Sequence, residues 1–203
     1  MTGNTRDLLD MWNIPRVHHS AVAPPDDEAA LVEAARHDPA AFARLYRRYV
    51  IPVYRYLFSR TGNEADAQDL TAQVFLEALE GLPRYHDRGN FAAWLFTFAR
   101  RRAVDHYRRR QPLPLDDELD PADETDLQAH VIEHEALDRL QTLIAQLTDD
   151  QRELLRLRFA AGLTFGQIGR TLGRREAAVK MAVHRLLDQL RVKWRAQDEH
   201  VAE

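Results

Sequence analysis

Two clusters of basic residues are the part of this sequence best suited to chemistry, because guanidinium and ammonium groups bind phosphate. Residues 100–110, RRRAVDHYRRR, carry six arginines and one aspartate, and residues 171–195 carry seven lysines and arginines against two carboxylates. Seven carboxylates lie between them at residues 116–126, and the formal net charge is −4. Two solvated helix faces with an acidic loop would give the same pattern. Charge alone therefore does not establish a nucleic-acid interface.

Composition narrows the protein class. The chain has 203 residues, of which 45% are hydrophobic and 30% charged, as in a folded protein of one domain or two small ones. No apolar run approaches the roughly 20 residues needed to cross a bilayer, and the N-terminus lacks the apolar stretch of a secretory signal. The absence of cysteine excludes disulfides, thiolate zinc sites and a cysteine nucleophile. We expect a cytoplasmic protein without membrane insertion.

Apolar residues recur at steps of three and four, which predicts an all-α fold. Asp38-Pro39 and Gly62-Asn63 mark helix boundaries, and a long helix is expected over residues 91–110. Three prolines and most of the acid cluster make residues 111–128 a linker. The predicted units are a mobile extension at 1–26, a domain at 27–110, a linker at 111–136, a domain at 137–196 and a tail at 197–203.

Helical spacing also predicts which side chains are buried. In the helix after Asn63 we expect a buried stripe of Ala67, Leu70, Val74, Ala78 and Leu79. In the last helix we expect burial of Ala178, Val179, Ala182, Val183 and Leu186. The aromatic residues at the start of the 91–110 helix are interpreted chiefly as core: Phe91, Trp94 and Phe98, with Leu95.

Residues 147–191 have the pattern of a helix-turn-helix. Thr148 and Thr164 can cap two short helices, Gly162 supplies a turn, and Gly173 stands where a left-handed residue is needed. In that motif the third helix enters the major groove. The candidates for base and phosphate contacts are Arg174, Arg175, Lys180, His184 and Arg185. A three-helix bundle with an ordinary basic surface remains the alternative.

Three segments in order carry a family resemblance: DAQDLTAQVFLEAL (66–79), NFAAWLFTFARRRAVDHYRRR (90–110) and the helix-turn-helix segment. Together they resemble the sigma-70 family, and more narrowly its extracytoplasmic-function (ECF) group, which keeps only sigma domains 2 and 4. The resemblance covers about residues 28–110 and 137–194. It implies two small helical domains, sigma domain 2 and helix-turn-helix sigma domain 4, joined by a flexible acidic linker. The implied function is an alternative sigma factor that directs promoter-specific initiation by core RNA polymerase.

The resemblance also implies roles for individual residues. The 66–79 segment resembles the region that docks on the β′ clamp helices of the polymerase, through Asp66, Asp69 and Gln73. The loop 84–90 resembles the one that accepts a flipped-out −10 base, lined by Tyr85, His86, Asp87 and Asn90. Phosphates or base edges of the −10 element would be held by Arg100, Arg101, Arg102, Arg108 and Arg109. The helix-turn-helix would read the −35 element on the polymerase β flap, and an anti-sigma factor would be a further partner. No cofactor, metal or catalytic residue is implied.

The sequence departs from the family pattern at two places. Many family members have Asn-Leu where this chain has Arg101-Arg102, so an arginine there either lies at a helix edge or contacts DNA. Early in the recognition helix, Arg175 and Glu176 stand where the family often has a small or hydroxyl residue. The docking mode is unaffected, but the preferred −35 sequence is open.

Two other classes of function compete. A stand-alone transcriptional regulator would share the helix-turn-helix, but it has no reason to contain the 66–110 segment. A metal-dependent enzyme could use His130 and His134 on one helical face, yet no HExxH motif and no third ligand accompany them. We interpret these histidines as an incidental surface pair.

Overall fold

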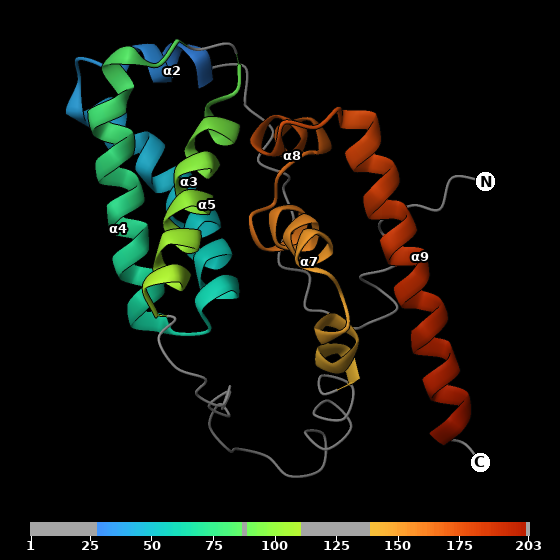
Figure 1. Cartoon of the computed structure of the whole chain (residues 1–203). Coiled ribbons are helices and arrows are strands. Elements are labelled where there is room, and N and C mark those ends of the chain that lie inside the picture. The colour runs from blue at the N-terminus through green and yellow to red at the C-terminus, as the bar shows by residue number, and fades with distance from the viewer. Residues whose placement is uncertain (1–27, 87–88, 111–138, 202–203) are drawn as a thin grey trace.

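A computed structural model describes residues 28–86, 89–110 and 139–201, and within these ranges all regular structure is helical. The expected all-α fold is confirmed. The first unit contains α2 (Glu28–Ala34), α3 (Pro39–Thr61), α4 (Glu64–Gly81), a 3-10 turn (Leu82–Arg84) and α5 (Phe91–Arg110). The second contains a helix at 139–145, α7 (Asp149–Leu155), a π-helical turn (Arg156–Ala160), α8 (Phe165–Leu172) and α9 (Glu176–Val201). Figure 1 shows α2–α5 as a bundle with α7 and α8 beside it and α9 on the far side.

Local side-chain chemistry explains where the helices of the first unit begin and end. Asp38 accepts a hydrogen bond from the Ala40 amide at 2.8 Å, and Pro39 occupies the first helical position of α3. Gly62 ends that helix with φ of 64°, a left-handed conformation that favours glycine. The side chain of Asn63 then accepts from the Asp66 amide and starts α4. All these boundaries were predicted.

The helix-turn-helix boundaries depend on two reciprocal capping boxes. The Thr148 hydroxyl accepts from the Gln151 amide while the Gln151 side chain accepts from the Thr148 amide, and Thr164 and Gln167 repeat the arrangement at α8. Gly173, with φ of 67°, ends α8. The predicted caps and the predicted glycine turn are therefore confirmed, and α9 starts where the motif requires.

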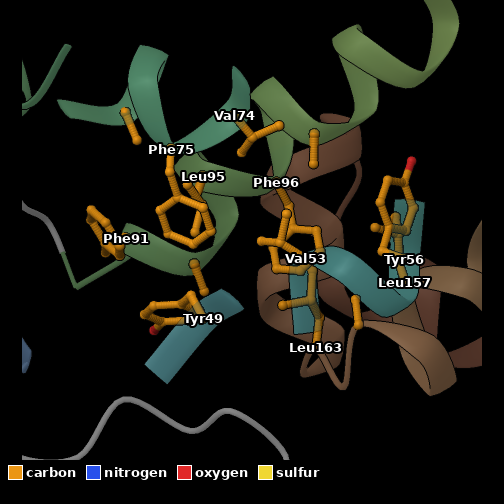
Figure 2. Packing of buried hydrophobic residues seen from close by; sticks show 14 of the residues in the cluster. Tyr49, Val53, Tyr56, Val74, Phe75, Phe91, Leu95, Phe96, Leu157 and Leu163 are labelled. Carbon is orange, nitrogen blue, oxygen red and sulfur yellow. The ribbon is translucent and has the colours of Figure 1, made fainter. Parts of the chain in front are cut away.

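One buried cluster of side chains extends from the first unit into the second. Tyr49, Val53 and Tyr56 of α3 are fully buried in it. Leu157, within the π-helical turn, and Leu163, three residues after its end, are equally buried, and Figure 2 shows them beside α3. A smaller cluster joins the 139–145 helix to α9 through Leu143, Leu147, Leu186 and Leu190. The second unit thus shares much of its core with the first.

The predicted burial is wrong for two residues. Leu79 is 47% exposed, and Ala178 is also exposed. Each helical residue is turned by about 100° from its neighbour, so Leu79 points away from the stripe that ends at Ala78. Phe75 contributes to the buried face of α4 instead. Ala178 is likewise one position from the buried Val179 and is turned away from that face of α9.

No helix in the described part of the chain combines the length and the apolar character needed to span a bilayer.

Candidate nucleic-acid interface

The start of α9 presents exposed cations. Arg175, Lys180 and Arg185 are all exposed. No carboxylate within residues 28–86, 89–110 and 139–196 pairs with any of them. Arg174 differs, because its guanidinium pairs with Asp150 of α7. His184 is half-buried, with its ring centroid 6.0 Å from that of Phe165. Of the five residues predicted for the −35 element, three are free to meet phosphate or base edges, and two contact the protein.

Close packing of α8 against α9 holds those cations outward. A Cβ atom added at Gly169 would lie 2.6 Å from the Arg174 carbonyl oxygen, so the turn between the helices approaches α8 as closely as glycine allows. The Arg174 amide donates to the Gly169 carbonyl oxygen at 2.7 Å. Val179 and Val183 are buried on the inner face of α9. The opposite face of the first turns of α9 is therefore left to solvent.

The cations of α5 are mostly paired. Arg101 and Arg102 both form ion pairs with Glu77 of α4. Arg101 also lies over the Phe98 ring, 5.4 Å from its centroid. This arrangement accommodates the departure from the family pattern at Arg101-Arg102, because one carboxylate on the neighbouring helix pairs with both side chains and offsets one of their two charges. Glu77 is half-buried because this part of α4 meets α5.

Arg100 makes a longer-range pair. Its Nε atom lies 3.4 Å from Oε1 of Glu153, a residue of α7. Arg108 and Arg109 are exposed, and no carboxylate of the described residues pairs with them. Among the five arginines predicted for the −10 element, the last two are thus the most accessible to a DNA backbone.

The loop before α5 packs on aromatic side chains. Tyr85 is buried, and its ring centroid lies 4.5 Å from that of Trp94 and 5.9 Å from that of Phe91. Arg36 donates a hydrogen bond to the Tyr85 carbonyl oxygen. His86 is exposed, Asn90 is half-buried, and Asp87 lies outside the described residues. Tyr85 therefore anchors this loop to the aromatic side chains of α5, whereas the His86 side chain is exposed to solvent.

Trp94 and Phe98 show a feature that the sequence interpretation underestimated. Both are only half-buried, and their rings form an edge-to-face pair with centroids 4.7 Å apart. Half-exposed aromatic rings beside arginines are a platform on which unstacked bases can lie. The helical spacing of the two aromatics signalled burial and could not distinguish full from partial burial.

The α4 face predicted for protein docking is partly exposed. Asp69 is exposed and Gln73 half-buried, while Oδ2 of Asp66 lies 3.5 Å from Nε2 of His106 on α5. Leu76 is 60% exposed on the same helix. A protein interface has an apolar core and a polar rim. Leu76 together with Asp69 and Gln73 supplies side chains of both kinds. The paired Asp66 is less accessible than its two predicted companions.

Comparison with known proteins places these features in a family. The family model for sigma-70 region 2 matches residues 45–112, and that for sigma-70 region 4 matches residues 137–190. The chain belongs to the sigma-70 family. The two matched regions together span more than half of the chain, and their order agrees with an ECF sigma factor. The alternative, a stand-alone transcriptional regulator, is not favoured.

Individual relatives agree. The chain is 33% identical to the ECF RNA polymerase sigma factor BldN of Streptomyces coelicolor over 85% of this chain and 69% of the relative. It is 35% identical to the ECF RNA polymerase sigma factor RpoE of Cereibacter sphaeroides over 81% and 93%. The solved structure of CnrH in complex with the cytosolic domain of CnrY has the same fold, with a TM-score of 0.61 at 23% identity over 86% of this chain and 99% of CnrH. The chain is therefore an alternative sigma factor, a class of transcription proteins that are not enzymes in general.

The candidate metal pair His130 and His134 and the acidic linker lie outside the described residues. Sequence reasoning missed two carboxylates that pair with predicted DNA contacts. Glu153 was not assigned a role, and Glu77 was not assigned its arginine partners. Their partners lie on other helices, so no spacing along the chain signals them.

Proposed function

We propose that this chain binds bacterial core RNA polymerase and directs it to promoters by reading a −35 element with α9 and a −10 element with α5 and the preceding loop. The observation that carries the proposal is the pairing, in one chain, of a region 2 and a region 4 that each present exposed cations. Neither surface is large. Binding energy from two modest sites adds when one scaffold holds both, which is the role that the polymerase supplies.

Each of the two units would recognise a different promoter element. Residues 27–110 would form sigma domain 2 and residues 137–196 sigma domain 4, with 1–26, 111–136 and 197–203 as extension, linker and tail. His86, Arg108 and Arg109 are the exposed candidates for the −10 element, and Asn90 is a half-buried one. Tyr85, Arg100, Arg101 and Arg102 would contribute only after rearrangement, because each is buried or paired here. Asp87 completes the −10 set.

The polymerase would meet α4. Asp66, Asp69 and Gln73 supply acceptors for the basic side chains of the β′ clamp helices, and the exposed Leu76 and Leu79 supply apolar area beside them. Sigma domain 4 would lie on the β flap. The proposed site of action is the cytoplasm, without any cofactor, metal or catalytic residue.

An anti-sigma factor is the further partner that we propose. Leu76 and Leu79, both exposed on α4, supply apolar area that a protein partner can cover when polymerase is absent. CnrH, which shares this fold, was solved in complex with the cytosolic domain of CnrY. A protein that covers α4 would compete directly with the polymerase.

Run-off transcription from a library of promoter fragments tests the function. Core polymerase with this chain should give specific starts that share a −35 and a −10 pattern, and core polymerase alone should not. Absence of specific starts, together with no co-elution with core polymerase, would favour a stand-alone regulator. Co-elution without transcription would retain the polymerase contact and remove the promoter assignment.

Two α9 residues should differ in what they recognise. Arg175 stands at the start of the recognition helix, where side chains reach base edges, so Arg175→Ala should cost about 1–3 kcal/mol and relax one −35 position. Lys180 lies one turn further along, and Lys180→Ala should weaken all promoters alike and reduce the salt dependence. Transcription from −35 libraries at two salt concentrations measures both effects. Identical promoter profiles for the two variants would refute the distinction.

A further inference from the structure

Arg36 joins the turn after α2 to the loop before α5. Its guanidinium donates a hydrogen bond through Nη2 to the carbonyl oxygen of Tyr85, 49 residues further along the chain. Nη1 of the same group lies 3.2 Å from a carboxylate oxygen of Glu33. The Arg36 side chain is only 17% exposed, whereas that of Glu33 is 62% exposed. Arginine side chains are mostly exposed in proteins, so burial to this degree indicates a specific contact rather than a solvated surface charge.

The packing of α2 fixes the place from which Arg36 reaches the loop. Leu31 and Val32 are buried, and Figure 1 shows α2 across the end of the bundle at which α4 ends and α5 begins. The Tyr49 hydroxyl of α3 donates a hydrogen bond to the buried Glu28 at the start of α2. Burial raises the pKa of Tyr49, and the hydrogen bond to Glu28 raises that pKa further, so the hydroxyl stays a donor. The turn that carries Arg36 therefore follows a helix that is tied to α3.

Three groups of Tyr85 are held by the protein. Its ring packs on Trp94, with centroids 4.5 Å apart, and its amide donates to the Leu82 carbonyl oxygen at 3.1 Å. These two contacts fix the side chain and the chain that enters the residue. The ψ angle of Tyr85 is 124°, and rotation about ψ turns the carbonyl group and the next amide together. Because Arg36 binds the carbonyl oxygen, it holds ψ at this angle.

The peptide between Tyr85 and His86 carries this constraint into the loop. No peptide bond of the described residues is cis, and in a trans peptide the N–H points opposite to the C=O. The His86 amide is therefore directed away from Arg36, and the His86 side chain is exposed. An amide so directed can donate to a base edge or to a phosphate oxygen. The direction of both His86 groups thus depends on the contact that Arg36 makes.

We propose that Arg36 is a positioning residue for the −10 element, which holds the Tyr85 carbonyl group and thereby orients the start of the loop for one −10 base. The inference rests on the proposed sigma function. Arg36 acts through the Tyr85–His86 peptide and does not itself touch DNA. A loop that is ordered before binding loses less conformational entropy when the base arrives, so the contact strengthens the preference for the base that fits.

Run-off transcription from promoters randomised at each −10 position tests the role. Arg36→Met keeps the apolar part of the side chain and removes the guanidinium. It should reduce the preference for the best base at one −10 position by about tenfold, because a hydrogen bond from a charged donor is lost. Arg36→Lys keeps a charged donor and should recover part of that preference. An equal loss of transcription from every −10 variant, without a change in base preference, would indicate a purely structural role and overturn the proposal.

The matched control is Arg55→Met. Arg55 is exposed on α3, so this variant removes the same atoms and the same charge from the same unit without removing a hydrogen bond to the loop. Its −10 preferences should match those of the native chain. Circular dichroism melting shows whether each variant is folded. A folded Arg36→Met variant with the base preferences of the native chain would overturn the role in −10 selectivity.

Amide relaxation in the free, full chain tests the loop without transcription. The ¹H–¹⁵N nuclear Overhauser effect of His86 should be that of an ordered amide in the native chain and in Arg55→Met, and it should fall in Arg36→Met. Equal values in the native chain and Arg36→Met would overturn the ordering of the loop by Arg36. If none of the chains supports specific transcription, the proposed sigma function fails, while the relaxation data still decide whether Arg36 fixes the Tyr85–His86 peptide.

Discussion

Gly169→Ala should reduce promoter-directed transcription at least tenfold. A Cβ atom at this position would lie 2.6 Å from the Arg174 carbonyl oxygen and 3.3 Å from the Glu176 amide nitrogen. Both neighbours are backbone atoms of the turn that leads into α9, so the clash is relieved only if α9 moves relative to α8. Overpacking of this kind costs about 1–3 kcal/mol and displaces the side chains proposed for the −35 element. Run-off transcription and thermal melting measure the two consequences.

Gly166→Ala is the matched control. Its Cβ atom would meet Oε2 of Glu176 at 3.1 Å, the far end of a flexible side chain that can rotate away. Alanine is also the better helix former, by about 1 kcal/mol. We expect transcription within about twofold of the native chain and an equal or higher melting temperature. Equal losses in the two glycine variants would show that the close approach of α8 and α9 is not what matters.

Phe96→Ala should lower the free energy of unfolding by about 3–5 kcal/mol. The Phe96 ring is fully buried in the middle of α5 and lies edge-on to Tyr56, with centroids 5.7 Å apart. Its removal opens a cavity beneath α3, close to the tyrosine that contacts Glu153. Urea denaturation followed by circular dichroism gives the change in free energy.

Phe58→Ala removes the same ring from a different environment. Phe58 is 43% exposed and stacks on Tyr54, with centroids 6.0 Å apart. Because 43% of its surface stays exposed to water and its removal leaves no enclosed cavity, the expected cost is smaller, about 1–2 kcal/mol. A cost equal to that of Phe96→Ala would mean that burial does not determine the contribution of these rings.

The helices and their ends were determined locally. Asp38, Asn63, Thr148 and Thr164 each cap a helix with a side chain that reaches an amide two or three residues on, so adjacent residues suffice to predict them. The bounds of α5, Phe91–Arg110, agree with the expected 91–110. The family was determined in the same way, because its motifs are contiguous stretches of sequence.

Contacts between helices decided which arginines of the candidate site are paired with carboxylates. Glu77 meets Arg101 and Arg102 across 24 and 25 residues of chain, and Glu153 meets Tyr56 across 97. Charge and helical spacing place such residues on a polar face, but they do not say which partner that face meets. Only the packing of α5 on α4 and α7 assigned three of the predicted DNA contacts to carboxylates.

Burial at the edge of a stripe was decided in the same way. Leu79 and Ala178 each stand one position from a buried residue, and their apolar character agreed equally well with burial or exposure. Hydrophobic spacing gives the direction of a helix face, whereas the width of that face depends on how much of it a neighbouring helix covers. The sequence thus determined the helices, their caps and the family, and the tertiary structure decided which cations are free, because pairing depends on side chains brought together only by folding.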